Sequence, residues 1–305
     1  MPDATAPEST ARSRPRLVRL IFDKYGIATI AIIGAGPIGG AVARKLAARR
    51  RVGRIRLIDP DVRVAEGKAL DILQSGPVEG FDTDVTAAAD YAASAGADAI
   101  VIADLVSGGE IAGETGLMLV KRIAAVDSKA PLLFAGGGQR ELMTRSAVEL
   151  HVPRSTLVGS APLALESAVR ALAGALIDAS PTDIALGITG VPPADAVIGW
   201  DAATAFNQPI ARALAPHHMA SLSSRLPALW PPSPYSLGSA GARIAEALAH
   251  GSRRRYTCFA VVDAPGIGRN IVAAVPVELV EGGIGRTREP ALSRHERTLF
   301  ERGLR

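Results

Sequence analysis

The stretch AIIGAGPIGGAVARKLA, residues 31–47, decides how the first half of this sequence folds. Its aliphatic start is typical of a buried strand, and its second half has the spacing of a helix. Between the two, the motif G-x-G-x-x-G falls on Gly34, Gly36 and Gly39. Glycines in this position allow a tight turn, a close approach of backbone to pyrophosphate, and close packing of helix on strand. The stretch therefore predicts a dinucleotide site at a helix N-terminus, with Pro37 and Ile38 inside the turn.

A second signal lies at Asp59, which ends the aliphatic run IRLI and follows Gly34 by 25 residues. An acid there can accept hydrogen bonds from the adenosine ribose hydroxyls and repels a 2′-phosphate. Strand, glycines and acid together predict NAD rather than NADP as the cofactor. The alternative is a glycine-rich strand-to-helix turn without a ligand, and Arg63 is a nearby residue that could admit a phosphate.

Short aliphatic runs alternate with amphipathic stretches through the first half, which is typical of βαβ units and a parallel sheet. We expect an α/β fold: an N-terminal Rossmann domain with a doubly wound parallel sheet, residues 27–159, and a C-terminal α+β domain, residues 160–305. The expected strands are 28–33, 55–58, 99–103, 131–135, 156–158, 182–187, 256–262 and 271–280. The expected helices are 37–50, 64–74, 114–126, 139–148, 163–175, 216–225, 236–249 and a last one that begins at the capping-box pair Ser293 and Glu296.

Composition excludes several classes of protein. With 48% hydrophobic and 21% charged residues the chain reads as globular, and no apolar run approaches the ~20 residues of a membrane span. A single cysteine, Cys258, and the lack of a secretory signal indicate the cytoplasm. The net charge of +4 is not interleaved with aromatic residues, so no nucleic-acid partner is expected. No Cys/His cluster has metal-ligand spacing, and the start of the predicted arm, residues 1–26, reads as disordered.

The stretch GKALDILQSGPVEGFDTDV, residues 67–85, follows GAGPIGG and LIDPD and resembles the lactate/malate dehydrogenase family. The likeness is strongest to its NAD-dependent malate dehydrogenases, and it extends to PYSLGSAGARIAEAL at 234–248 and VAAVPVELVEGGIGR at 272–286. It implies the family's two-domain fold, NAD as cofactor and a homo-oligomer, either dimer or tetramer. It also implies hydride transfer between nicotinamide and a substrate carbonyl, with a histidine moving the proton and arginines binding the carboxylate.

Several positions depart from the pattern that this resemblance implies. The family's mobile loop corresponds to VSGGEIAGETG, residues 106–116, which places Glu110 and Gly116 where two arginines are expected. An acid at that place repels an anionic substrate. The substrate-binding asparagine corresponds to Gly138, in a glycine-rich turn that we interpret as flexible rather than as a phosphate loop.

Three residues remain as catalytic candidates by resemblance. Glu166 stands at the aspartate that holds the histidine, and Arg170 falls one or two positions from either expected arginine. Their spacing is equally that of a helical ion pair worth ~0.3 kcal/mol. Thr189 stands at the histidine itself, in GITGV, and its hydroxyl does not titrate near neutrality. None of the five histidines lies in a motif that places it in the cleft.

Two functions are therefore compatible with the sequence. The first is an NAD(H)-binding protein that has lost the 2-hydroxy-acid reaction and serves as a sensor, scaffold or partner. The second is a working NAD-dependent oxidoreductase that acts on a malate-like or an uncharged carbonyl substrate, whose identity the sequence leaves open. A purely structural oligomer is disfavoured by Asp59 and the three glycines.

Overall fold

The computed structural model describes residues 28–126, 129–264 and 266–305, so the arm predicted over residues 1–26 lies outside the described part. The first half forms a parallel sheet in the spatial order β3-β2-β1-β4-β7-β8. This is the doubly wound order expected of a dinucleotide-binding sheet. The strands are β1 (Thr29–Ile33), β2 (Arg54–Ile58), β3 (Asp84–Ala88), β4 (Ala99–Ile102), β7 (Leu132–Phe134) and β8 (Leu157–Gly159).

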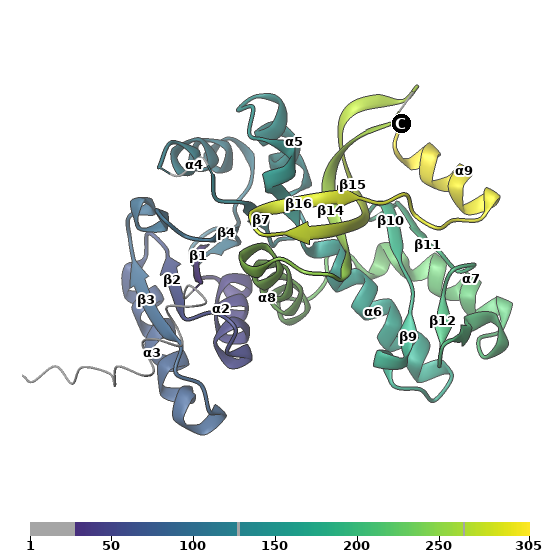
Figure 1. Ribbon diagram of the computed structural model, residues 1–305, viewed down its shortest axis with the longest axis horizontal. Coiled ribbons are helices and arrows are strands. Elements are labelled where there is room, and N and C mark those ends of the chain that lie inside the picture. The colour runs from purple at the N-terminus through teal and green to yellow at the C-terminus, as the bar shows by residue number, and fades with distance from the viewer. Residues whose placement is uncertain (1–27, 127–128, 265) are drawn as a thin grey trace, which may run out of the picture.

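Helices cover both faces of this sheet, which is why its central strands are aliphatic throughout (Figure 1). Helices α4 and α5 pack together on one face, and α2 packs between α3 and α8 on the other. The helices are α2 (Pro37–Arg49), α3 (Val62–Glu79), α4 (Gly113–Val126), α5 (Arg140–Val148) and α8 (Pro234–His250), with a short helix at Tyr91–Ser94.

The sheet continues into the second half, because β8 pairs antiparallel with β14 at Gly159 and Phe259. One 11-stranded sheet therefore crosses the predicted domain boundary, and that boundary stays a prediction. A second hydrophobic cluster forms around α6. The strands here are β9 (Ile184–Ala185), β10 (Ile188–Val191), β11 (Asp195–Ile198), β12 (Thr204–Ala205), β13 (Gln208–Pro209), β14 (Arg255–Ala264), β15 (Gly268–Val280) and β16 (Gly283–Thr287). The helices are α6 (Ala161–Leu176), α7 (Pro216–Arg225) and α9 (Arg294–Gly303).

Several elements differ from the sequence prediction, which did not include the strands β3, β10, β11, β12, β13 and β16. Helix α3 runs on through Pro77 and ends at Gly80, whose φ of +77° suits a glycine cap. The strand expected at 182–187 is shortened to β9, which pairs with β12, and the unpredicted β10 follows it and pairs with β11 and β15. The segment expected as a loop at 106–116 contributes to a hairpin of β5 (Asp104–Leu105) and β6 (Gly109–Glu110). The capping box that begins α9 is confirmed.

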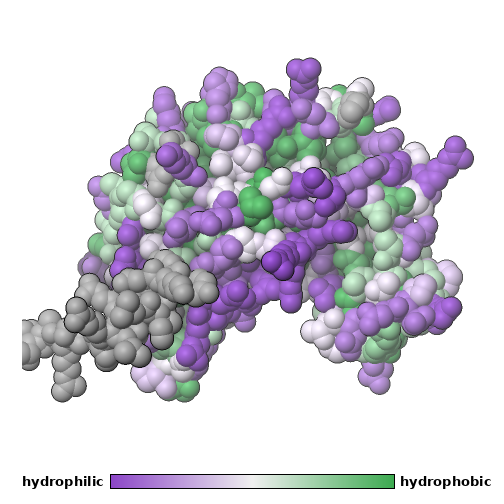
Figure 2. All heavy atoms as spheres, viewed as in Figure 1, coloured by the Kyte–Doolittle hydropathy of each residue, from purple (hydrophilic) through white to green (hydrophobic). Residues whose placement is uncertain are grey.

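Helix α8, from the second half of the chain, packs against α2, which follows the predicted dinucleotide turn. A Cβ added to Gly238 would lie 2.4 Å from the Cβ of Ala41, so the two helices touch through small residues. Arg49 on α2 also forms an ion pair with the buried Glu246 on α8. Hydrophilic side chains gather across the middle of the molecule over α8 and β16 (Figure 2). Over the described ranges, no helix is both long and apolar enough to span a bilayer.

Candidate functional site

The dinucleotide turn lies where β1 passes into α2. Gly34 adopts a φ of +100°, and its N–H donates to the carbonyl oxygen of Ile58 at 2.7 Å, which ties the turn to the end of β2. Pro37 opens α2, where its missing N–H costs nothing. The structure thus brings together the predicted glycines, Pro37, Ile38 and Asp59 at the carboxyl ends of β1 and β2. Their contact with a cofactor stays a prediction.

Asp59 is bonded within the chain. Its Oδ2 accepts from the N–H groups of Ala35 at 2.8 Å and Val106 at 3.1 Å, and its Oδ1 accepts from the N–H of Asp61 at 2.9 Å. The residue is only 1% exposed. In this conformation Asp59 joins the turn, β2 and the β5–β6 hairpin, and its oxygens are closed to a ribose.

Asp104 occupies the N-terminus of α2. Its Oδ2 accepts from the N–H of Ile38 at 3.1 Å and its Oδ1 from the N–H of Gly39 at 2.9 Å, while its backbone oxygen accepts from Gly36 at 2.8 Å. A Cβ on Gly36 would lie 2.4 Å from the Asp104 Cγ. A helix N-terminus favours negative charge. The Asp104 carboxylate therefore occupies the position at the glycine-rich turn where a phosphate would bind. The sequence prediction missed Asp104, although an acid directly after β4 was visible.

Every backbone N–H between Gly34 and Gly39 already has an acceptor in the chain. The side chain of Lys68, from the GKALD stretch on α3, donates to the carbonyl oxygens of Ala35 and Gly36. A pyrophosphate needs those same N–H groups, and it carries the same sign of charge as Asp104. As described, the turn has the shape of a dinucleotide site but does not fit a bound dinucleotide.

Glu110 closes a second glycine-rich turn, at the end of β7. Its two carboxylate oxygens accept from the N–H groups of Gly137 at 3.0 Å and Gly138 at 2.7 Å. Gln139 accepts from the N–H of Gly136 and donates to the carbonyl oxygens of Ala103 and Ile111. The turn is therefore held by side chains on both sides, rather than being the flexible segment that the sequence suggested.

Gly116, at the other expected arginine position, is buried on α4. A Cβ there would lie 3.1 Å from Leu142 on α5. A side chain at this position would therefore require the Leu142 side chain to shift.

Glu166 and Thr189 line one pocket of about 380 Å³, together with Arg255, Thr257 and Arg288. Glu166 Oε2 accepts from the Thr257 hydroxyl at 2.5 Å. Burial raises the pKa of the Glu166 carboxyl, against the Thr257 hydrogen bond and the charge of Arg170, which lower it. The Thr189 hydroxyl is buried and has no hydrogen-bond partner among the described residues. The structure therefore brings two of the three catalytic candidates together.

Arg170 lies outside that pocket. Its Nε and Nη2 donate to the carbonyl oxygen of Pro181 at 3.1 and 2.9 Å, and its Nη1 is 3.9 Å from Glu166 Oε1. These contacts favour the helical ion pair over a substrate-binding role. No histidine of the described chain lines the pocket, and no group of acids, cysteines and histidines in the described ranges could hold a metal ion.

Comparison with known proteins shows what the first part of the chain resembles. Residues 28–130 match the family model for the lactate/malate dehydrogenase NAD binding domain. A malate dehydrogenase of Roseiflexus sp. (strain RS-1) is 47% identical over 73 residues, which span 24% of this chain and 23% of that protein. The match thus covers about a quarter of the curated relative.

Solved structures extend the similarity of fold to nearly the whole chain. The apo malate dehydrogenase of Picrophilus torridus superimposes with a TM-score of 0.79 at 20% identity, over 91% of this chain and 94% of that one. The lactate dehydrogenase of Cryptosporidium parvum, solved with lactic acid and nicotinamide adenine dinucleotide, gives 0.80 at 18% identity over the same shares. Residues 28–130 therefore resemble the NAD binding domain of the lactate/malate dehydrogenase family, and the overall fold of the chain is that of these dehydrogenases.

Proposed function

We propose that this protein binds NAD(H) but has no appreciable 2-hydroxy-acid dehydrogenase activity, and that it acts as a sensor, scaffold or partner subunit. The observation that carries the proposal is Thr189. It stands where the family resemblance implies the proton-transferring histidine, and its buried hydroxyl has no hydrogen-bond partner among the described residues. A positioned general acid contributes typically 10²–10⁴ in rate, which a threonine hydroxyl does not replace.

The positions expected to bind the substrate support the same proposal. Glu110 is committed to the amides of Gly137 and Gly138, and Gly116 is buried against Leu142. Neither position offers a positive charge to a carboxylate. These losses act on one transition state, so they are not independent and additive penalties.

The proposal predicts binding without turnover. Titration calorimetry is expected to show that NADH binds and that NADPH binds much more weakly, because an acid at the end of β2, here Asp59, repels a 2′-phosphate. A spectrophotometric assay is expected to show no NADH oxidation with oxaloacetate or pyruvate. Thr189→His is expected to raise the rate less than about tenfold, since the substrate still has no cation to dock against. Wild-type turnover of oxaloacetate at about one per second or faster overturns the proposal.

A second candidate function is an NAD-dependent oxidoreductase that acts on a malate-like or an uncharged carbonyl substrate. The specific observation in its favour is the pocket of Glu166 and Thr189, whose lining also includes the cationic side chains of Arg255 and Arg288. A screen of keto acids, aldehydes and ketones with NADH separates the two functions. Activity confined to one of these substrates, and lost in Arg288→Gln, selects the second.

We also propose a homo-oligomer in the cytoplasm. Helix α3 exposes four aliphatic side chains, Val64, Leu70, Leu73 and Val78, the last of them 89% exposed. Exposed apolar surface can mark an interaction site, and soluble oligomers are mostly symmetric assemblies of one chain. A second copy of this chain is the partner that we assign to this helix.

A further inference from the structure

The β5–β6 hairpin places a carboxylate at each of its ends, and each carboxylate is held by backbone N–H groups. Asp104, at the first end, is 4% exposed and bonds to Ile38 and Gly39 at the start of α2. Glu110, at the second end, bonds to Gly137 and Gly138 after β7. The hairpin thus bridges the carboxyl ends of β1 and β7, where ligands bind in doubly wound sheets.

The electrostatics of Asp104 match those of a bound phosphate. Two N–H groups at a helix N-terminus, plus the positive end of the helix dipole, stabilise one negative charge there. Hydrogen bonds to a charged acceptor are roughly twice as strong as neutral ones. A pyrophosphate and the Asp104 carboxylate need the same donors and repel each other, so they cannot occupy the turn together.

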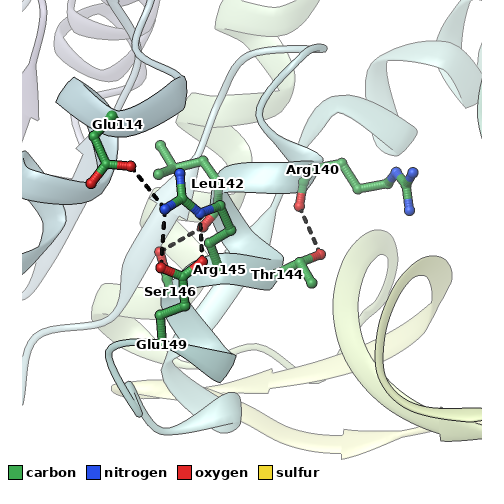
Figure 3. A network of polar contacts seen from close by, with 7 residues as sticks. All are labelled: Glu114, Arg140, Leu142, Thr144, Arg145, Ser146 and Glu149. Carbon is green, nitrogen blue, oxygen red and sulfur yellow. Dashed lines mark hydrogen bonds and ion pairs between the residues drawn. The ribbon is translucent and has the colours of Figure 1, made fainter.

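The hairpin is held at its base by hydrogen bonds among Ala103, Ile111 and Gln139, and we call this base the neck. The N–H of Ile111 donates to the carbonyl oxygen of Ala103 at 3.1 Å, and Gln139 Nε2 donates to the carbonyl oxygens of both residues. Beyond the neck, α4 is tied to α5, because Arg145 donates to Glu114 at 2.9 Å (Figure 3). Movement of residues 104–110 away from the sheet edge would break the hydrogen bonds of Asp104, Val106 and Glu110, and it would leave those of the neck and of Arg145 intact.

We propose that the hairpin of residues 104–110 is an internal competitor of the dinucleotide, and that Asp104 holds the cofactor site shut. The proposal rests on the NAD(H) binding proposed above. NAD(H) then binds only to the fraction of molecules whose hairpin has left the turn, so its measured affinity is the intrinsic affinity reduced by that fraction. Weakening the Asp104 contact raises the affinity without any new contact to the cofactor.

The test compares NADH affinity in four proteins by titration calorimetry. Asp104→Asn removes the charge but keeps the size of the side chain, and is expected to tighten NADH binding by about tenfold or more, the scale of one lost charge-assisted hydrogen bond. Glu110→Gln releases the other end of the hairpin and is expected to give a smaller gain. Asp98→Asn is the matched control, because Asp98 accepts from the N–H of Thr29 at 2.7 Å at the opposite end of β1. Its affinity is expected to equal that of the wild type.

A second measurement detects the contact of Asp104 with Ile38 and Gly39 in the absence of NADH. In hydrogen exchange of the free wild type, the amides of Ile38 and Gly39 are expected to be protected, and Asp104→Asn is expected to lose that protection while the core of β1 keeps it. This pattern also shows that the variant is folded.

The outcomes separate the two proposals. If NADH binds equally to wild type and Asp104→Asn, or more weakly to the variant, the proposal that the hairpin competes with the dinucleotide is wrong. The proposed function is unaffected by that result. No NADH binding by the wild type, Asp104→Asn or Glu110→Gln overturns both.

Discussion

Glu166 is a buried carboxyl whose contribution to the free energy of folding depends on pH. Because burial raises its pKa in the folded state, protonation favours folding at acidic pH, and this contribution is lost as the pH rises through the raised pKa. At pH 7 the group therefore contributes less to folding stability than it does at acidic pH. Glu166→Gln keeps an acceptor for the Thr257 hydroxyl without the charge. We expect the variant to have a higher Tm than the wild type at pH 7, and an advantage that shrinks toward pH 4.

Calorimetric melting from pH 4 to pH 8 checks this, with the exposed Glu66→Gln on α3 as the control for a lost surface charge. A variant whose Tm is below the wild type throughout this range would show that the charged form of Glu166 is stabilising.

At the residue scale, local signals were readable from the sequence and distant contacts were not. The glycines of the 34–39 turn and Asp59 have fixed spacings along the chain, so their positions could be predicted. The role of Asp104 could not, because its bonds to Ile38 and Gly39 join residues 66 and 65 positions apart. Nothing local distinguishes an acid that fills an anion site from an acid on the surface.

At the scale of elements, Arg145 joins two helices that flank the hairpin. It donates to Glu149 at the end of α5 and to Glu114 at the start of α4. Figure 3 shows both carboxylates turned toward its guanidinium. The hydrogen bond from Arg145 holds the pKa of the Glu149 carboxyl below its usual value. A depressed carboxyl pKa contributes stability above the ordinary pKa and loses it as the pH falls.

We therefore expect Arg145→Gln to lower the Tm at pH 7, with a difference from the wild type that closes toward pH 3. High salt is expected to reduce the difference as well, because the pairs are exposed. Arg140→Gln is the control on the same helix, since Figure 3 shows the Arg140 guanidinium directed away from this cluster. A Tm loss that is independent of pH and salt would assign Arg145 to packing rather than charge.

Whole elements were predictable where their signals were internal to them. The capping box of Ser293 and Glu296 begins α9 as expected, because both bonds lie within one turn. The hairpin of β5 and β6 was missed, since strands of two residues have no periodicity to detect. Strand β10 was missed because it depends on pairing with β11 and β15, which come later in the chain.

At the scale of the whole molecule, the family model matches residues 28–130, while the similarity of fold extends over 91% of the chain. The sequence predicted the parallel sheet because each βαβ unit repeats the same local pattern. It did not predict that the sheet continues through Gly159 into β14, since antiparallel pairing across that point leaves no mark on either strand alone.

The oligomeric state is the last property that this fold leads us to predict. The exposed aliphatic residues of α3 are expected to be covered by a second copy, so light scattering at micromolar concentration should give a mass of at least twice the 31.5 kDa of one chain. Leu70→Glu places a charge in that contact, which is expected to shift the mass toward the monomer. Met118→Glu on α4 is the matched control, because Met118 is similarly exposed, at 51% against 54%, but lies on the opposite face of the sheet. A wild-type protein that remains at 31.5 kDa, or a Met118→Glu variant that dissociates as readily as Leu70→Glu, would show that α3 is not the interface.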